Sequence, residues 1–123
     1  MKKMVLGCLL AIGMISGLYA DSAADEQFKQ YVNLTKNSPE NPKGMTVCAD
    51  NTYRIIYISM PIPLSSSDAT PAVISKMKSG MLAEMGKLKE DVKIVKDLKI
   101  NFVYSFIATD KRVFCIAVSY KDF

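Results

Sequence analysis

Two stretches of the chain have the hydrophobic period of an amphipathic helix. The first covers residues 22–36, where side chains suited to a core recur every three or four positions: Phe28, Tyr31, Val32 and Thr35. The turn-forming residues from Asn37 to Pro39 end this helix. A polar loop rich in turn residues then extends to Gly44.

The second helical pattern covers residues 71–88. Thr70 or Asp68 can cap its N-terminus, and Pro71 suits the first turn. One continuous apolar stripe runs along it: Val73, Ile74, Met77, Met81, Met85 and Leu88. Residues 90–97 fit either a continuation of this helix or an edge strand, and the pattern leaves both open.

The remaining regular segments have the composition and alternation of β-strands. Residues 52–60, 98–108 and 113–120 are rich in β-branched and aromatic side chains, and residues 45–49 form a shorter candidate strand. Residues 109–112 connect the last two strands as a C-terminal hairpin. The order of elements predicts an α+β domain with a small antiparallel sheet of about three to five strands and two helices packed on it.

The register of the C-terminal hairpin decides which side chains share a face. A two-residue turn at Asp110-Lys111 would pair Phe106 with Cys115 and Tyr104 with Ala117, whereas a three-residue turn would shift these partners. In the two-residue register both faces are apolar, and the second helix can cover only one. The first helix could cover the other face, or part of that face could bind a partner.

The candidate partner-binding residues come from this hairpin and from the long loop of residues 61–71. The set is Phe114, Ile116, Val118, Tyr120, Val103, Ile107, Ile62 and Leu64. The loop begins with Pro61 and Pro63 and contains the large apolar side chains Ile62 and Leu64, which fits a functional loop or a plain crossover between a strand and a helix.

The N-terminus has the layout of a secretory signal peptide, residues 1–20. Lys2 and Lys3 precede an almost wholly apolar run, and the segment ends at the small residue Ala20. We therefore expect one exported domain, residues 21–123, in the periplasm or secreted. An uncleaved membrane anchor and lipidation of Cys8, which follows Val5-Leu6-Gly7, are the alternatives.

Export changes the interpretation of the two remaining cysteines, Cys48 and Cys115. An even pair in an oxidising compartment predicts a disulfide, worth about 4 kcal/mol for so long a loop; two buried free thiols are the alternative. The net charge of +4 falls by two when Lys2 and Lys3 are removed. This mild charge favours neither nucleic acid nor strong attraction to membranes.

The absence of histidine excludes most catalytic chemistry. Ser–His and Cys–His pairs and His-ligated metal sites are impossible, and there is no Gly-rich phosphate loop. We therefore expect no enzyme activity and no cofactor. Met77, Met81 and Met85 stack on one helix face, which fits a Cu(I) site, an adaptable apolar groove, or ordinary packing against the sheet.

These features together predict a small exported protein-binding module that works without catalysis. An inhibitor, an immunity protein or an accessory factor of envelope assembly would fit, with a protein partner, no nucleic acid and no stable membrane insertion after cleavage. The alternative is a carrier of a small apolar ligand or soft metal that uses the Met-rich helix. A further alternative is a lipidated or anchored envelope component.

Overall fold

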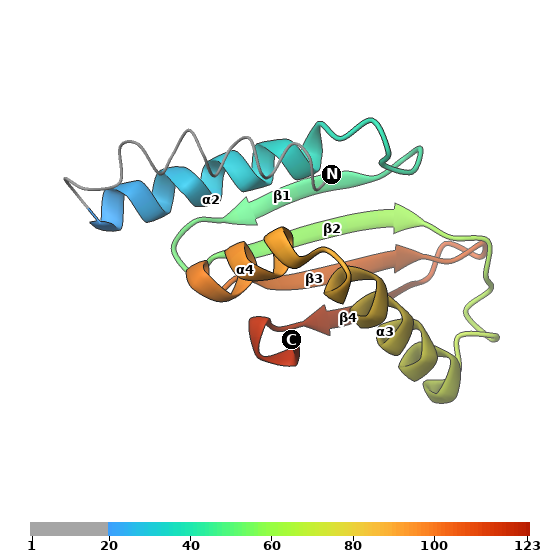
Figure 1. The fold of residues 1–123 in the computed structure, drawn as a ribbon. Helices are drawn as coiled ribbons and strands as arrows, with labels where there is room; N and C mark the ends of the chain where they lie inside the picture. Colours follow the sequence, from blue (N-terminus) through green and yellow to red (C-terminus); the bar gives the residue numbers. More distant parts are fainter. Residues whose placement is uncertain (1–19) are drawn as a thin grey trace.

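Three α-helices and a four-stranded sheet make up residues 20–123, the part of the chain that the computed structural model describes (Figure 1). The elements in chain order are α2 (Ala20–Lys36), β1 (Thr46–Asp50), β2 (Ile55–Pro61), α3 (Pro71–Gly86), α4 (Lys89–Leu98), β3 (Asn101–Ile107), β4 (Val113–Val118) and the short 3-10 helix η1 (Tyr120–Asp122). The predicted α+β class is confirmed. The predicted signal peptide, Cys8 included, lies outside the described residues apart from Ala20, the first residue of α2.

The sheet is mixed, with strand order β1-β2-β3-β4. The β1–β2 and β3–β4 pairs are antiparallel, as predicted, but β2 and β3 run parallel. Parallel neighbours need a long crossover, and the chain supplies one through α3 and α4 (Figure 1). Residues 90–97 belong to α4, so the crossover contains two helices and not one.

Two of the helix ends follow from identifiable residues. Thr70 caps α3, where its Oγ1 accepts a hydrogen bond from the Val73 N–H at 3.3 Å. At the C-terminus of α4, Lys99 adopts the left-handed conformation with φ 55°. This ends the helix and turns the chain into β3, a position at which glycine is more usual.

The hairpin between β3 and β4 has a three-residue loop, so it adopts the second of the two registers that the sequence left open. The Lys111 N–H donates to the Ala108 carbonyl at 3.0 Å, and the Ala108 N–H donates to the Arg112 carbonyl at 2.8 Å. Lys111 has a positive φ of 69°, which closes a loop of this length. Phe106 therefore pairs with Phe114 and not with Cys115.

This shift of one residue moves every β4 side chain to the opposite face of the sheet. Phe114, Ile116 and Val118 join the face that the helices cover, together with Ile56, Ile58, Phe102 and Phe106. The core therefore lies in one layer between the helices and this face. Its largest fully buried side chains are Phe28, Ile56, Ile100, Val95 and Val118.

The predicted disulfide between Cys48 and Cys115 is absent, and both cysteines are free and exposed. Cys48 lies on β1 and Cys115 on β4, which are the opposite edges of the sheet. Three strand spacings separate these edges by about 14 Å. A disulfide requires Cα atoms within about 7 Å, so this fold cannot close the bridge.

We predict that both thiols react with a water-soluble thiol reagent in the native protein, without prior reduction. The Cys48→Ser, Cys115→Ser double variant should change the free energy of unfolding by less than about 0.5 kcal/mol in urea titration, because both side chains are exposed. A structural disulfide would instead give unreactive cysteines and a loss of about 4 kcal/mol.

Candidate functional site

The residues predicted to bind a partner are divided between the two faces of the sheet. Ile116 and Val118 are only 3% and 1% exposed, and Phe114 and Tyr120 are half-buried and pack against the core. The prediction is therefore wrong for Ile116 and Val118, because the hairpin register places them in the core. Half-buried Val103 and Ile107 do lie on the face opposite the helices.

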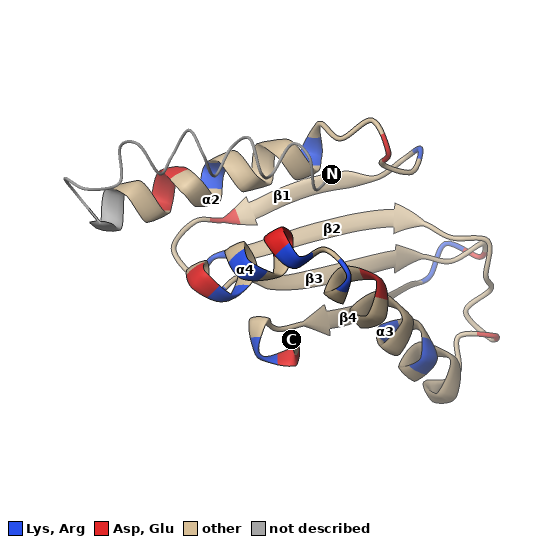
Figure 2. Cartoon of the chain, viewed as in Figure 1, with Lys and Arg blue, Asp and Glu red and all other residues tan. Residues whose placement is uncertain are grey.

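We call this opposite face the open face, because the helices of residues 20–123 lie on the other side of the sheet (Figure 1). The pairing registers place on it Thr46, Cys48, Asp50, Ile55, Tyr57, Ser59, Pro61, Asn101, Val103, Ser105, Ile107, Val113, Cys115 and Ala117. Asp50 is the one charged residue within the four described strands (Figure 2). Tyr57 and Val113 are exposed there, so the open face presents large apolar side chains to solvent.

The loop that contains Ile62 and Leu64 is tied to the β3–β4 hairpin. The Ile62 N–H donates to the Ile107 carbonyl at 3.0 Å, and the Thr109 N–H donates to the Leu64 carbonyl at 2.9 Å. The Ser66 N–H also donates to Asp110 Oδ1 at 3.2 Å. Both apolar side chains are half-buried, so this loop extends the end of the sheet and does not project freely.

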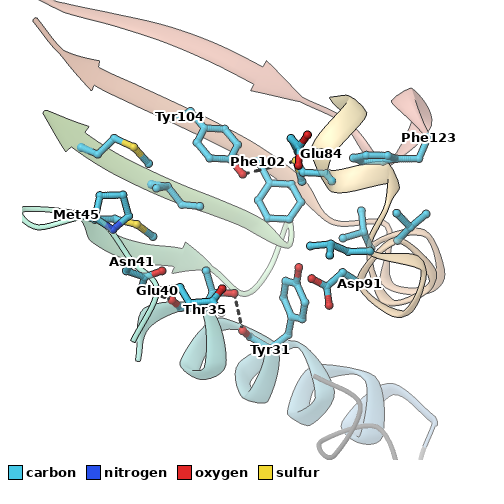
Figure 3. A pocket seen from close by; sticks show the side chains of 17 residues that line it. Tyr31, Thr35, Glu40, Asn41, Met45, Glu84, Asp91, Phe102, Tyr104 and Phe123 are labelled. Atoms are coloured by element: carbon cyan, nitrogen blue, oxygen red, sulfur yellow. Dashed lines mark hydrogen bonds between the residues drawn. The ribbon is translucent and has the colours of Figure 1, made fainter. Parts of the chain in front are cut away.

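A cavity of about 360 Å³ opens on the helix-covered face, between α2 on one side and α3 and α4 on the other (Figure 3). The sheet forms its floor through Ile58 and Met60 of β2 and Phe102 and Tyr104 of β3. The two strands that pair in parallel therefore lie directly beneath it.

The walls of the cavity come from separate elements and are mostly apolar. α2 contributes Tyr31 and Thr35, and the segment before β1 contributes Met45. The other side is formed by Met85 at the end of α3, Leu88 between the two helices, and Phe123 near the C-terminus, together with three residues of α4: Asp91, Val92 and Val95. The break between α3 and α4 brings both helices to this wall.

The methionine stripe of α3 contributes to the cavity only at its C-terminal end. Met77 and Met81 are half-buried and pack against the core, whereas Met85 lines the cavity. Within the described residues, no group of three or more Cys, Asp or Glu side chains is placed to hold a metal ion. The stripe is thus mainly packing surface, with one thioether at the cavity.

Seven residues of the described lining have polar side chains, and two of them, Tyr31 and Asp91, are almost fully buried. Tyr31 is 4% exposed and Asp91 is 5% exposed, and Figure 3 shows their polar ends pointing toward one another. The hydroxyl of Thr35 donates to the Tyr31 carbonyl at 2.9 Å within α2. Opposite, the Tyr104 hydroxyl donates to Met85 Sδ at 3.8 Å.

Both tyrosine hydroxyls of the cavity keep their protons. Burial raises the pKa of Tyr31 far above its usual range, and the negative charge of Asp91 raises it further. Burial also raises the pKa of Tyr104 to about 12. At neutral pH both side chains are therefore uncharged hydrogen-bond donors.

The charged groups that line the cavity all have the same sign. They are the carboxylates of Glu40, Glu84 and Asp91; within the described lining there is no lysine or arginine. Glu84 is exposed at the rim and pairs with Lys87 at 3.0 Å. Asp91 lies deeper in the wall and is almost fully buried.

Sequence reasoning missed this cavity because it could not place residues 90–97. In α4, Asp91 shares one helix face with the buried Val95 and Leu98, at positions i, i+4 and i+7. A carboxylate inside an apolar stripe is an available signal of a site. It can be used only once the segment is known to be a helix.

No protein family, curated protein or solved structure matches this chain in the comparisons. None of the helices of residues 20–123 combines the length and apolar character needed to cross a lipid bilayer.

Proposed function

We propose that this protein binds a small, mainly apolar molecule in the cavity above β2 and β3. The cavity itself is the observation that carries the proposal. Ligand sites are concave, mostly apolar and about 300–1000 Å³ in volume, with a few convergent polar groups. A cavity of about 360 Å³ with Tyr31, Tyr104 and Asp91 in its lining has this character.

The volume and the lining limit what the ligand can be. The cavity volume of about 360 Å³ is near the lower end of the usual range for ligand sites, so the proposed ligand is small. Each buried CH₂ contributes about 0.8 kcal/mol. An eight-carbon chain therefore gains about 6 kcal/mol before the entropic cost of binding, which corresponds to weak or moderate affinity.

The lining also supports binding more than reaction. The floor and walls present methionine, leucine, isoleucine, valine and aromatic side chains. The Thr35 hydroxyl is engaged within its own helix, and both tyrosines stay protonated. We therefore propose a carrier or sensor without catalysis, which acts in the periplasm or outside the cell if the N-terminal pattern directs export.

We predict that Val92→Phe weakens binding of octan-1-ol at least tenfold, measured by isothermal titration calorimetry. The added ring would occupy the cavity that Val92 lines. Val73→Phe is the matched control, because Val73 is a half-buried valine of α3 outside the lining. Equal affinity of wild type and Val92→Phe would show that the cavity is not the binding site.

The open face supports a second candidate function, binding of a protein partner. It is an apolar, nearly uncharged sheet surface that includes the predicted residues Val103 and Ile107. Large exposed apolar patches commonly mark interaction sites. The proposed partner contacts this surface and leaves the cavity on the other side of the sheet accessible.

This second candidate predicts that a partner retained by the immobilised protein from a cell extract is lost with Val103→Lys. Ser79→Lys adds the same charge at an exposed position on α3, away from the open face, and should leave retention unchanged. Loss of the retained partner with both variants, or with neither variant, would contradict a role for the open face.

A further inference from the structure

We propose that the ligand of the cavity is a small uncharged molecule with a carbonyl oxygen, which accepts a hydrogen bond from the Tyr104 hydroxyl in place of the Met85 thioether. This inference rests on the proposed function and adds the chemical class of the ligand. It depends on three observations: the weak partner of the Tyr104 hydroxyl, the apolar side chains beside it, and the absence of basic side chains from the described lining.

The Tyr104 hydroxyl has a poor hydrogen-bond partner. It donates to Met85 Sδ at 3.8 Å, and a thioether sulfur is a weak acceptor. Burial raises the pKa of Tyr104 to about 12, so at neutral pH the hydroxyl keeps its proton and remains a donor. A shielded donor with a weak acceptor is costly. A stronger acceptor at this position would therefore be favoured over the sulfur.

The side chains next to Tyr104 on its face of the sheet are apolar. It pairs with Ile58 of β2 and with Ile116 of β4. Along β3, the centroids of the Phe102 and Phe106 rings are each 6.1 Å from that of Tyr104. A carbonyl oxygen needs only a donor, so it suits this surface. An alcohol is less suitable, because it also brings an O–H that needs an acceptor.

The composition of the lining favours an uncharged carbonyl over an ionised carboxylate. The described lining contains no lysine or arginine, and Lys87, which pairs with Glu84 at 3.0 Å, lies outside it. A bound carboxylate would lose its hydration without a cation beside it. That loss costs far more than the transfer of a ketone or ester into the same site.

Met85 can give up the Tyr104 hydroxyl without a change in the sheet. It is half-buried near the C-terminal end of α3, a helix with no fully buried residue. Methionine is unbranched and flexible, so rotation of its side chain moves the sulfur while the helix stays in place. The ligand oxygen can then take the position of the sulfur as acceptor.

The experiment compares three eight-carbon ligands by titration calorimetry on the full chain: acetophenone, 1-phenylethanol and ethylbenzene. Tyr104→Phe removes the hydroxyl and keeps the ring. We expect this variant to bind acetophenone at least about fivefold more weakly than wild type, as for the loss of one hydrogen bond, and ethylbenzene within about twofold of wild type. Wild type should bind acetophenone at least about threefold more tightly than 1-phenylethanol, which has the same carbon skeleton.

Tyr57→Phe is the matched control and should leave all three affinities unchanged, because Tyr57 is exposed on the open face and outside the lining. Three results would overturn the inference and leave the cavity as a binding site: unchanged acetophenone affinity in Tyr104→Phe, an equal loss for ethylbenzene, or no preference of wild type for acetophenone over 1-phenylethanol. Failure of all three ligands to bind wild type would overturn both proposals.

Infrared spectroscopy of acetophenone bound to wild type decides the question if Tyr104→Phe does not fold. A hydrogen bond to the carbonyl oxygen weakens the C=O bond, so we expect a stretching frequency below that of acetophenone in hexane. A frequency equal to that in hexane would overturn the inference.

Discussion

The parallel pairing of β2 with β3 is the constraint on which the rest of the structure depends. These strands point the same way, so the chain must leave the end of β2 and return to the start of β3. α3 and α4 make that return over the same face of the sheet that α2 covers (Figure 1). The face is then covered from two sides, and the strip above β2 and β3 between the helices becomes the cavity.

The same constraint explains the difference between the two faces of the sheet. One face receives every described helix and supplies the core, from Ile56 on β2 to Val118 on β4. The other keeps an apolar but exposed surface, with Cys48 and Cys115 at its two edges. A single layer of helices cannot cover both faces of one sheet, so within residues 20–123 one exposed face follows from the architecture.

Local sequence patterns predicted the elements better than their arrangement. The first helix, the N-terminal cap of α3 and the C-terminal hairpin all depend on interactions within a few residues, and all three are in the structure, with Thr70 and not Asp68 as the cap. The hairpin register depends on whether Lys111 adopts a positive φ, which composition does not determine for lysine. That one angle decides whether Ile116 is in the core or on the surface.

The site itself could be predicted only in part. The methionine stripe indicated a possible ligand site on α3. Of its three methionines, only Met85 lines the cavity. Tyr31, Phe102 and Asp91 belong to separate elements, and only the parallel crossover brings them together. The disulfide prediction was wrong for the same reason. An even number of cysteines suggests a disulfide only if the two side chains can meet, whereas the strand order puts Cys48 and Cys115 on opposite edges of the sheet.

We propose that the space above β2 and β3 is a binding site and not a packing defect. The most direct test is NMR of the protein labelled with ¹³C at its methionine methyl groups, during titration with octan-1-ol. Met45, Met60 and Met85 line the cavity, whereas Met77 and Met81 pack elsewhere on the core. We expect the signals of Met45, Met60 and Met85 to shift and to saturate together. Saturable binding that leaves these three unmoved, or no binding at all, would contradict it.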